Sequence, residues 1–497
     1  MTRLSAHIFS LVLATSLIVG GILPLSAQTL YYNRSGNPGW FGVTPWGTTG
    51  TGGPFGTVWT DGNVADFGTG TGGNLDVAIA GSNVAVAGLT TSGTQVVRIN
   101  NGGTLQTMTF SGGALNGNFN LNNRVTVTGN LSVASGTTTF ATIGTATAYS
   151  GTAIIGASGE LSVTDAARLS ATANVTVQSG GRFSLATGGS STMGTLDLSG
   201  VGPGSTGALR IGDNTSSAGS NLTVGTLVGS GSIAVRANTS VAQHSLTVNG
   251  SGDSFYSGNI SATGTNSTLS LTKSGAGGLT LSGNLSGFTR TTAVNGGSLF
   301  INSSTTSFGD SSGATAVSVT GSGLLGGTGT ITTLDGDNVI IGSGGGLAAG
   351  LMNGTAGLTT YALGSGSNLD VSAATAGTGW LKFELGADTT FGTTYDQIRL
   401  SSGTLSIGSG LLNFADFEFT ALSGFGEGTY TLFDNAAMSG TLASGGLSGT
   451  VGGFNAVLSL SGSDIILTTT AIPEPSTVAS LLAGLGLLAL LRRRHAA

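Results

Sequence analysis

Few side chains between the two ends of the chain could carry acid–base or nucleophilic chemistry. The sequence has no Cys and three His, of which His244 alone lies outside residues 1–27 and 472–497. A Ser-His-Asp triad would therefore depend on His244, and thiolate or His-rich metal sites are excluded. His244 stands at an alternation point beside a predicted strand, and we expect it to face solvent.

Two acidic pairs have a spacing that could serve glycoside cleavage. Asp335 and Asp337, and likewise Asp416 and Glu418, are two residues apart and would share one face of an extended strand. Hydrolysis needs two carboxyl groups roughly 5–9.5 Å apart. Neither pair has Lys or Arg close by in the sequence, and no third group is present to tune it. We predict no catalytic residue, and a polysaccharide lyase or hydrolase remains the enzymatic alternative.

Asp335, Asp337 and Asn338 also offer hard oxygen ligands of the kind that calcium prefers. The loop lacks EF-hand spacing and its terminal Glu, and an Asp-Gly turn explains the same residues. We predict neither a metal site nor a cofactor.

The composition limits the class of protein further. The chain has 497 residues, 90 of them Gly, with 7% charged and 39% hydrophobic residues. This apolar content argues against charge-driven disorder, and the irregular Gly spacing with only 7 Pro excludes collagen. Without the two terminal segments, 11 basic and 20 acidic residues remain, so we predict no nucleic-acid binding.

The middle of the chain consists of short segments in which apolar and polar residues alternate, and these segments must position any functional side chains. Each has apolar residues two apart on one face, with mostly Thr, Ser and Gly on the other. Helical periodicity is essentially missing between the two ends. The apolar pairs are Val125 and Val127, Leu131 and Val133, Leu161 and Val163, Val175 and Val177, Phe183 and Leu185, Leu222 and Val224, Ile233 and Val235, Leu246 and Val248, Leu279 and Leu281, and Leu299 and Ile301.

The spacing of these segments decides the predicted fold class. Leu161 precedes Phe183 by 22 residues and Leu279 precedes Leu299 by 20. Such periods fit the coils of a parallel β-solenoid better than hairpins every 8–12 residues. Gly-rich turns such as 179–181 and 295–297 separate the strands. We therefore predict an all-β protein with a solenoid over residues 74–471.

Residues 28–73 hold Trp40, Trp46 and Trp59 with several other large aromatics, and we predict an N-terminal cap there. A sugar-stacking patch of exposed rings is the alternative. Thr and Ser are expected on the outward strand face, for example the threonines at 137–139 and 291–292, where they could bind glycans, matrix polymer or ice, although Thr is also simply a common strand residue.

The N-terminus has the pattern of a secretory signal peptide. Arg3 and His7 precede an apolar run from Ile8 to Leu25, and Ala27 supplies the small residue at the cut. We predict cleavage after Ala27. An uncleaved N-terminal anchor is the alternative.

The C-terminus combines three features in order. An extended Pro473, Glu474 and Pro475 leads into an apolar run from 478 to 491, and the basic residues Arg492, Arg493 and Arg494 follow. As a helix the run would span only about 21 Å, but the arginines would stay cytoplasmic and snorkel. A buried terminal helix would not explain three arginines beside an apolar face.

These residues, 472–497, resemble the PEP-CTERM sorting signal of exported Gram-negative proteins. The resemblance implies Sec export, transient anchoring in the inner membrane by a single apolar helix, and cleavage near Pro473–Pro475 by an exosortase. The processed protein would reach the cell surface or the extracellular space. A stably anchored membrane protein is the alternative.

A second resemblance concerns the middle of the chain. Residues 271–283, 291–299 and 324–331 resemble autotransporter-associated β-strand repeats, and 395–398 with 428–433 resemble the pattern that closes such passengers. The sequence 347–350 departs from the family, which tends to carry Pro where this chain has Ala. No series of amphipathic strands forms a translocator barrel at the end. Together the patterns predict a structural or adhesive surface protein with extracellular polysaccharide as its partner polymer.

Overall fold

The computed structural model describes residues 27–472 and six isolated positions between 484 and 494. Within 27–472 it leaves gaps at 33–39, 42–45, 50–54, 71–72, 80–81, 101–104, 123–124, 142–146, 187, 203–207, 213–218, 236–241, 263–266, 311, 375–378 and 389.

The described chain is built from β-strands and two short 3-10 helices, η1 (Ala166–Arg168) and η2 (Phe414–Asp416). The first strands are β1 (Thr29–Tyr32), β2 (Trp46–Gly47), β3 (Phe55–Thr57), β4 (Asn63–Gly70), β5 (Asn74–Ala78), β6 (Val84–Gly93), β7 (Val96–Asn100), β8 (Gln106–Asn116), β9 (Asn118–Leu121), β10 (Val125–Phe140) and β11 (Thr152–Val163). The middle strands are β12 (Asn174–Gln178), β13 (Arg182–Leu185), β14 (Gly189–Gly200), β15 (Leu209–Ile211), β16 (Ser220–Gly229), β17 (Ile233–Val235), β18 (Ala242–Val248), β19 (Ser254–Tyr256), β20 (Ile260–Ala262), β21 (Ser267–Lys273), β22 (Gly278–Leu281), β23 (Thr292–Ile301) and β24 (Thr315–Gly326). The last strands are β25 (Thr330–Thr332), β26 (Asn338–Ile341), β27 (Gly346–Ala348), β28 (Leu358–Ala362), β29 (Asn368–Asp370), β30 (Leu381–Leu385), β31 (Gln397–Ser402), β32 (Thr404–Leu412), β33 (Phe417–Ala421), β34 (Gly428–Asn435), β35 (Met438–Leu442), β36 (Ser448–Val451), β37 (Phe454–Ser461) and β38 (Asp464–Ala471).

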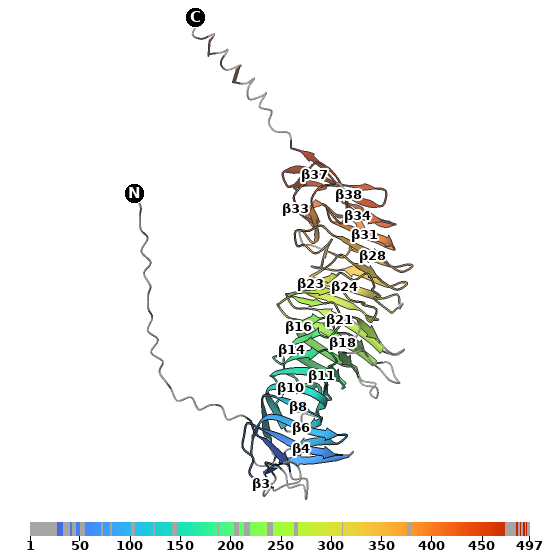
Figure 1. Ribbon diagram of the computed structural model, residues 1–497. Helices are drawn as coiled ribbons and strands as arrows, with labels where there is room; N and C mark the ends of the chain where they lie inside the picture. The colour runs from blue at the N-terminus through green and yellow to red at the C-terminus, as the bar shows by residue number, and fades with distance from the viewer. Residues whose placement is uncertain are drawn as a thin grey trace, which may run out of the picture.

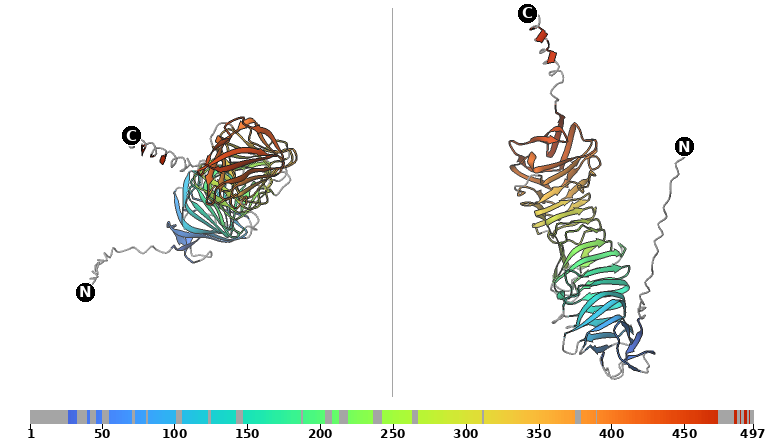
Figure 2. Two further views of the ribbon diagram at one scale, coloured as in Figure 1. Left: turned by 90° about the horizontal axis from the view of Figure 1, so that it is seen from above. Right: turned by 90° about the vertical axis from the view of Figure 1, so that its left-hand side faces the viewer.

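These strands stack into an elongated body, with the first strands at one end and the last at the other (Figure 1). The two further views show the same stack from above and from the side (Figure 2). Strand pairs across most of the stack are parallel, and each joins segments one coil apart in the chain. The all-β prediction is confirmed.

The two spacings measured on the sequence are spacings between register partners. Leu161 of β11 pairs with Phe183 of β13, and Leu279 of β22 pairs with Leu299 of β23. Later coils are longer: Leu381 pairs with Phe417, and Tyr361 pairs with Leu400. The number of residues between register partners is therefore larger in the later coils, while the strands continue to pair in parallel.

Antiparallel pairing of the described strands occurs at the two ends of the stack. At the first end β2 pairs antiparallel with both β1 and β3. At the last end β38 lies between β34 and β37, and β37 pairs with β36, all antiparallel. The outer edges of β1 and β34 are thus met by strands that run against them, which limits further edge-to-edge pairing there.

The core runs along the stack as rows of aliphatic side chains. Both members of every alternating apolar pair predicted from the sequence lie in strands and are buried. Period-two geometry also corrects one expectation, because Thr138 and Thr292 are each 0% exposed and point inward. Thr137 and Thr139 lie on the other face of β10, and Thr291 is exposed.

An aromatic cluster fills the first end of the stack. Trp40 and Trp46 are fully buried and Trp59 is 8% exposed, and their rings lie 4.8–5.0 Å apart with Tyr32 and Phe67 beside them. Trp46 Nε1 donates to the Trp40 carbonyl at 2.9 Å. These faces are consumed by packing, so the prediction that the Trp rings are buried is confirmed, and the sugar-stacking alternative does not fit them.

The predicted signal peptide, residues 1–27, and the predicted C-terminal apolar helix fall almost entirely outside the described residues. Helical backbone is recorded at Gly484, Leu485, Leu488, Leu491, Arg492 and Arg494. Within the described part of the chain, no helix has the length and apolar character needed to cross a bilayer.

Candidate functional site

His244 is inside the fold, so the prediction that it faces solvent is wrong. It shares the inward face of β18 with Leu246 and Val248, and it is 2% exposed. Its Nδ1 accepts a hydrogen bond from the Ser220 amide at 3.0 Å. The sequence held the signal, since a residue two positions before Leu246 belongs to the same strand face. The His244 imidazole therefore links its own coil to the coil that contains Ser220.

Asp335 and Asp337 do not share a face, because the chain turns at Gly336, where φ is 78°. Asp335 is exposed, and its Oδ1 accepts the Ser365 amide at 2.8 Å. Asp337 is 1% exposed, and its Oδ1 accepts from the amides at 313 and 314, both at 3.2 Å. Each carboxylate therefore holds the backbone of a different neighbouring coil.

Asn338 acts in the same way as these two aspartates. Its Oδ1 accepts the Asn368 amide at 2.8 Å. The side-chain oxygens proposed as calcium ligands thus bind backbone amides of adjacent coils. No cluster of three or more His, Cys, Asp or Glu suited to a metal ion occurs in the part of the chain that is described.

Asp416 and Glu418 have separate structural partners. Asp416 Oδ1 accepts from Trp380 Nε1 at 3.0 Å, and its Oδ2 accepts from the Asn413 amide at 2.8 Å, which caps η2. Glu418 forms an ion pair with Lys382, its register partner on β30. The sequence offered no nearby cation because Lys382 is a full coil away along the chain.

Glu384 and Asp396 form the most buried acidic arrangement of the described residues. Asp396 is 0% exposed, and its two oxygens accept from the amides of Gly357 at 2.5 Å and Glu384 at 2.7 Å. Glu384 is 4% exposed, its Oε1 accepts the Gly354 amide at 2.7 Å, and its buried Oε2 has no hydrogen-bond partner.

The environment of Asp396 perturbs its ionisation. Burial raises the pKa of Asp396 to about 7, the two backbone amides oppose that rise, and the negative charge of Glu384 adds to it. A carboxyl that titrates near neutrality beside a second carboxylate is the electrostatic arrangement of a proton-transfer pair. Here both groups lie beneath the surface and accept backbone amides.

Two buried cations were not singled out from the sequence. Arg168 is 2% exposed and donates to the carbonyls of Val125 at 3.1 Å and Leu121 at 3.3 Å, while burial lowers its pKa to about 10. Lys273 is 1% exposed and donates to the carbonyls of Gly275 and Gly296, and burial lowers its pKa. Both bind backbone oxygens within the stack.

The final strand holds the chain up to the predicted sorting signal. β38 is paired on both sides, and its last residue, Ala471, lies opposite Phe454 and donates its amide to Glu427 Oε1 at 2.6 Å. Thr469 Oγ1 donates to the Gly426 carbonyl at 2.6 Å. Ile472 is 46% exposed. The last described strand therefore ends at Ala471, two positions before Pro473 in the sequence.

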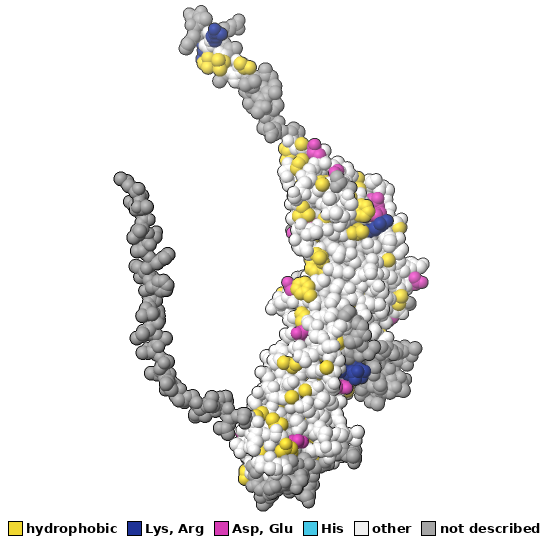
Figure 3. Space-filling model, viewed as in Figure 1, with side chains coloured by type: hydrophobic (Ala, Val, Ile, Leu, Met, Phe, Trp, Pro, Cys, Tyr) yellow, Lys and Arg dark blue, Asp and Glu magenta, His cyan; other side chains and the backbone are white. Residues whose placement is uncertain are grey.

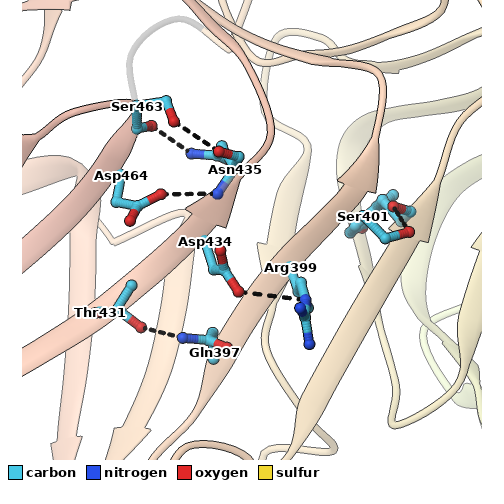
Figure 4. A network of polar contacts seen from close by, with 9 residues as sticks. Gln397, Arg399, Ser401, Thr431, Asp434, Asn435, Ser463 and Asp464 are labelled. Carbon is cyan, nitrogen blue, oxygen red and sulfur yellow. Dashed lines mark hydrogen bonds and ion pairs between the residues drawn. The ribbon is translucent and has the colours of Figure 1, made fainter.

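Polar contacts fix the other end of β38 to its neighbour (Figure 4). The Asn435 amide donates to Asp464 Oδ1 and Asn435 Nδ2 donates to the Ser463 carbonyl, both at 2.9 Å. Ser463 Oγ returns a hydrogen bond to the Asn435 carbonyl at 2.6 Å. β38 is therefore held at its beginning and at its end.

The segment that follows this strand has a recognisable counterpart. Residues 471–494 match a family model described as the PEP-CTERM protein-sorting motif. No curated protein gives a significant match to the chain.

The PEP-CTERM motif implies processing by an exosortase and export toward the cell surface. It contains Pro473, Glu474 and Pro475 together with Arg492, Arg493 and Arg494. The tripeptide and Arg493 lie outside the described residues, whereas Arg492 and Arg494 are described and exposed. The roles of these residues, and cleavage after Ala27, stay predictions.

Proposed function

We propose that the chain is an exported parallel β-solenoid with a structural or adhesive role, delivered through its PEP-CTERM motif. The observation that carries the proposal is the position of the motif. It starts at Ala471, the last residue of β38, so the sequence of the sorting motif follows directly on the final strand of the stack.

The domain division follows from the same proposal. Residues 1–27 form the signal peptide, 28–73 the N-terminal cap, 74–471 the solenoid, and 472–497 the sorting signal with its transient inner-membrane helix. The antiparallel strands at both ends support capping, because solenoids need terminal units that protect their open coils.

We assign residues 271–433 to autotransporter-associated β-strand repeats and their closing region. The two closing segments lie in contact in support of this assignment. The rings of Tyr395 and Tyr430 are 5.3 Å apart at 88°, and Gln397 Nε2 donates to the Thr431 carbonyl at 3.1 Å (Figure 4).

The surface supports a scaffold that presents hydroxyl and amide groups. On the face shown in Figure 3, little of the surface is charged, and the acidic and basic groups lie scattered over it. The low charge favours contact with an uncharged polymer over an electrostatic partner.

A carbohydrate-active enzyme on the same scaffold is the second candidate, and the Glu384 and Asp396 pair is the observation that favours it. Single substitutions Glu384→Gln, Asp396→Asn, Asp335→Asn and Asp337→Asn test it by depolymerisation of the host's exopolysaccharide. The structural role predicts no activity to lose. Loss of a measured activity in one folded variant would establish the enzyme instead.

Sorting is tested by mass spectrometry of the mature C-terminus in the native host. We expect a protein that ends near residues 471–475 and lacks the peptide with Arg492. A variant without residues 473–475 should keep that peptide, whereas Glu427→Gln, which alters only the contact to Ala471, should still be processed. Persistence of the intact C-terminus in wild-type mature cells would favour the stably anchored alternative.

A further inference from the structure

Two hollows on one side of the stack meet at the ring of Phe255. One, of about 230 Å3, is lined by Phe255, Thr280 and the hydroxyl residues Ser230, Ser257 and Ser282. The other, of about 330 Å3, is lined by Phe255 and Thr280 together with Phe300, Asp253, Ser298 and Asn353. The two hollows adjoin at Phe255 and Thr280, which line both, and we call them together the Phe255 groove.

The groove follows the axis of the stack. Its lining residues lie in or next to β14, β16, β19, β22 and β23, which are successive coils at this position, and in the loop at 351–353. Phe255 pairs with Thr280, and Thr280 pairs with Phe300, so the three side chains form one outward column. At about 4.8 Å per coil the two rings are about 9.6 Å apart, and the five strands cover about 19 Å.

The Phe255 ring is presented by a rigid strand. Its neighbours in β19 are buried, with Ser254 at 0% and Tyr256 at 1% exposure, while Phe255 itself is 63% exposed. Ser254 Oγ accepts the Leu227 amide at 3.1 Å, and Tyr256 Oη donates to the Gly231 carbonyl at 2.5 Å. Because the strand that carries it is already ordered, the exposed Phe255 ring can contact a ligand with little further loss of conformational entropy.

A buried carboxylate positions the loop that walls the far side of the groove. Leu351 and Asn353 line the hollow, and Met352 between them has φ of 54°, the only positive value of a non-glycine residue in the described chain. Glu384 Oε1 holds this loop by accepting the Gly354 amide at 2.7 Å. Glu384 is thereby a positioning residue for the groove wall.

The chemistry of the lining selects the ligand. Neither hollow is lined by Lys or Arg, and the one carboxylate, Asp253, accepts the Gly278 amide at 2.7 Å. Anionic polymers would meet no counter-charge here. Aromatic rings alternating with hydroxyl and amide groups suit a chain whose faces are apolar and whose edges carry hydroxyls. Sugar rings two positions apart in an extended β-linked chain match the distance between the phenyl groups.

We propose that the Phe255 groove binds a neutral, extended β-linked polysaccharide along the stack axis. This inference rests on the proposed extracellular role and names the site that would contact the polymer. Phe255 and Phe300 stack on sugar faces, while Thr280 and the flanking serines bind hydroxyl groups.

Binding of cellohexaose to the full-length protein, measured by calorimetry, tests the site, with alginate hexasaccharide as the anionic comparison. We expect saturable binding of cellohexaose, at least tenfold weaker alginate binding, and at least a tenfold loss of affinity in Phe255→Ala and in Phe300→Ala. Phe391→Ala removes another exposed ring, 43% exposed and outside the groove lining, and should bind as wild type.

Hydrogen exchange checks the location independently of variant folding. Cellohexaose should protect amides in 253–257, 278–282, 298–300 and 351–353 of the wild-type chain. Absence of cellohexaose binding, equal affinity after both Phe substitutions, or protection elsewhere would overturn the proposal. Since the C-terminal mass measurement reports export separately, a correctly processed protein that fails these tests leaves the proposed delivery intact.

Discussion

Arg399 and Asp434 occupy the same register position on the parallel strands β31 and β34, with Nε 3.3 Å from Oδ2 (Figure 4). Three further ion pairs follow this rule, because each joins direct register partners on adjacent coils. The other pairs are Asp76 with Arg98, Glu160 with Arg182, and Lys382 with Glu418. These four cations therefore each contact the acidic residue at the same register position of the neighbouring coil.

Reversing one partner tests this register. In Arg182→Glu, two carboxylates would face one another at Glu160, and we expect a local loss of about 0.5–1 kcal/mol in urea unfolding. The double change Glu160→Arg with Arg182→Glu should recover most of it. The effect should shrink in 1 M NaCl; a salt-independent loss that the swap does not restore would contradict the pairing.

The aliphatic rows predict local destabilisation by truncation. Leu299 is 1% exposed and pairs with Leu279 on one side and Leu325 on the other. Leu299→Ala should cost about 2–5 kcal/mol, because the coils on either side cannot close the cavity fully. Hydrogen exchange should show faster opening of β22, β23 and β24, with little change at the far ends. Leu411→Ala, at a side chain 59% exposed, is the control and should change stability by less than about 0.5 kcal/mol.

Glycine serves two purposes that a pair of variants can separate. The turn predicted at 295–297 is wrong, because these residues lie inside β23, whereas Gly462 lies in the turn between β37 and β38. Gly297 has φ of 61°, and a Cβ added there would lie 2.2 Å from the Gly277 carbonyl oxygen. Gly462 has φ of 66° with nothing within 4 Å. Gly462→Ala should cost about 1–2 kcal/mol from backbone strain alone. Gly297→Ala should cost clearly more by thermal unfolding, and equal costs would mean that coil approach is unimportant.

Asp396 predicts an inverse pH dependence. Its pKa rises from 3.8 unfolded to about 7 folded, chiefly through burial, so the folded state binds the proton more tightly. Its contribution to stability is therefore full below about pH 4 and is lost as the pH rises through 7, by about 1.4 kcal/mol per pH unit between these values.

The difference in unfolding free energy between wild type and Asp396→Asn isolates this contribution from other carboxylates. It should move in favour of the variant as the pH rises from 4 to 7. Glu384→Gln removes a neighbouring negative charge and should shift the transition to lower pH. A difference that is flat across this range would contradict the raised pKa.

Alternation in the sequence was sufficient to find buried strand faces, and the same alternation also places the polar residues and the outward aromatic ring of these strands. The parity that buries Leu246 and Val248 also buries His244, and the parity of Leu299 and Ile301 turns Phe300 outward. Thr138 and Thr292 follow the same rule. These positions were predictable because side-chain direction depends only on local backbone geometry.

Partners across coils could not be read in this way. Lys382 meets Glu418 36 positions later, whereas Arg182 meets Glu160 22 positions earlier. Since the coil length varies with each loop, no single period in the sequence identifies which acid faces which cation. For the same reason, the hydrogen bond from the Gly354 amide to Glu384 could not be predicted from the sequence.

The amino-acid sequence alone determined the strand character, the inward faces, the glycine turns and the terminal sorting motif, because each depends on residues that are adjacent in the chain. Tertiary structure decided the coil-to-coil register, the backbone amides that occupy the acidic side chains, and the alignment of Phe255 with Phe300 into one groove. These features depend on strands that are far apart in the sequence and become neighbours only in the folded stack. The loops between them differ in length, so packing between coils decides which residues meet.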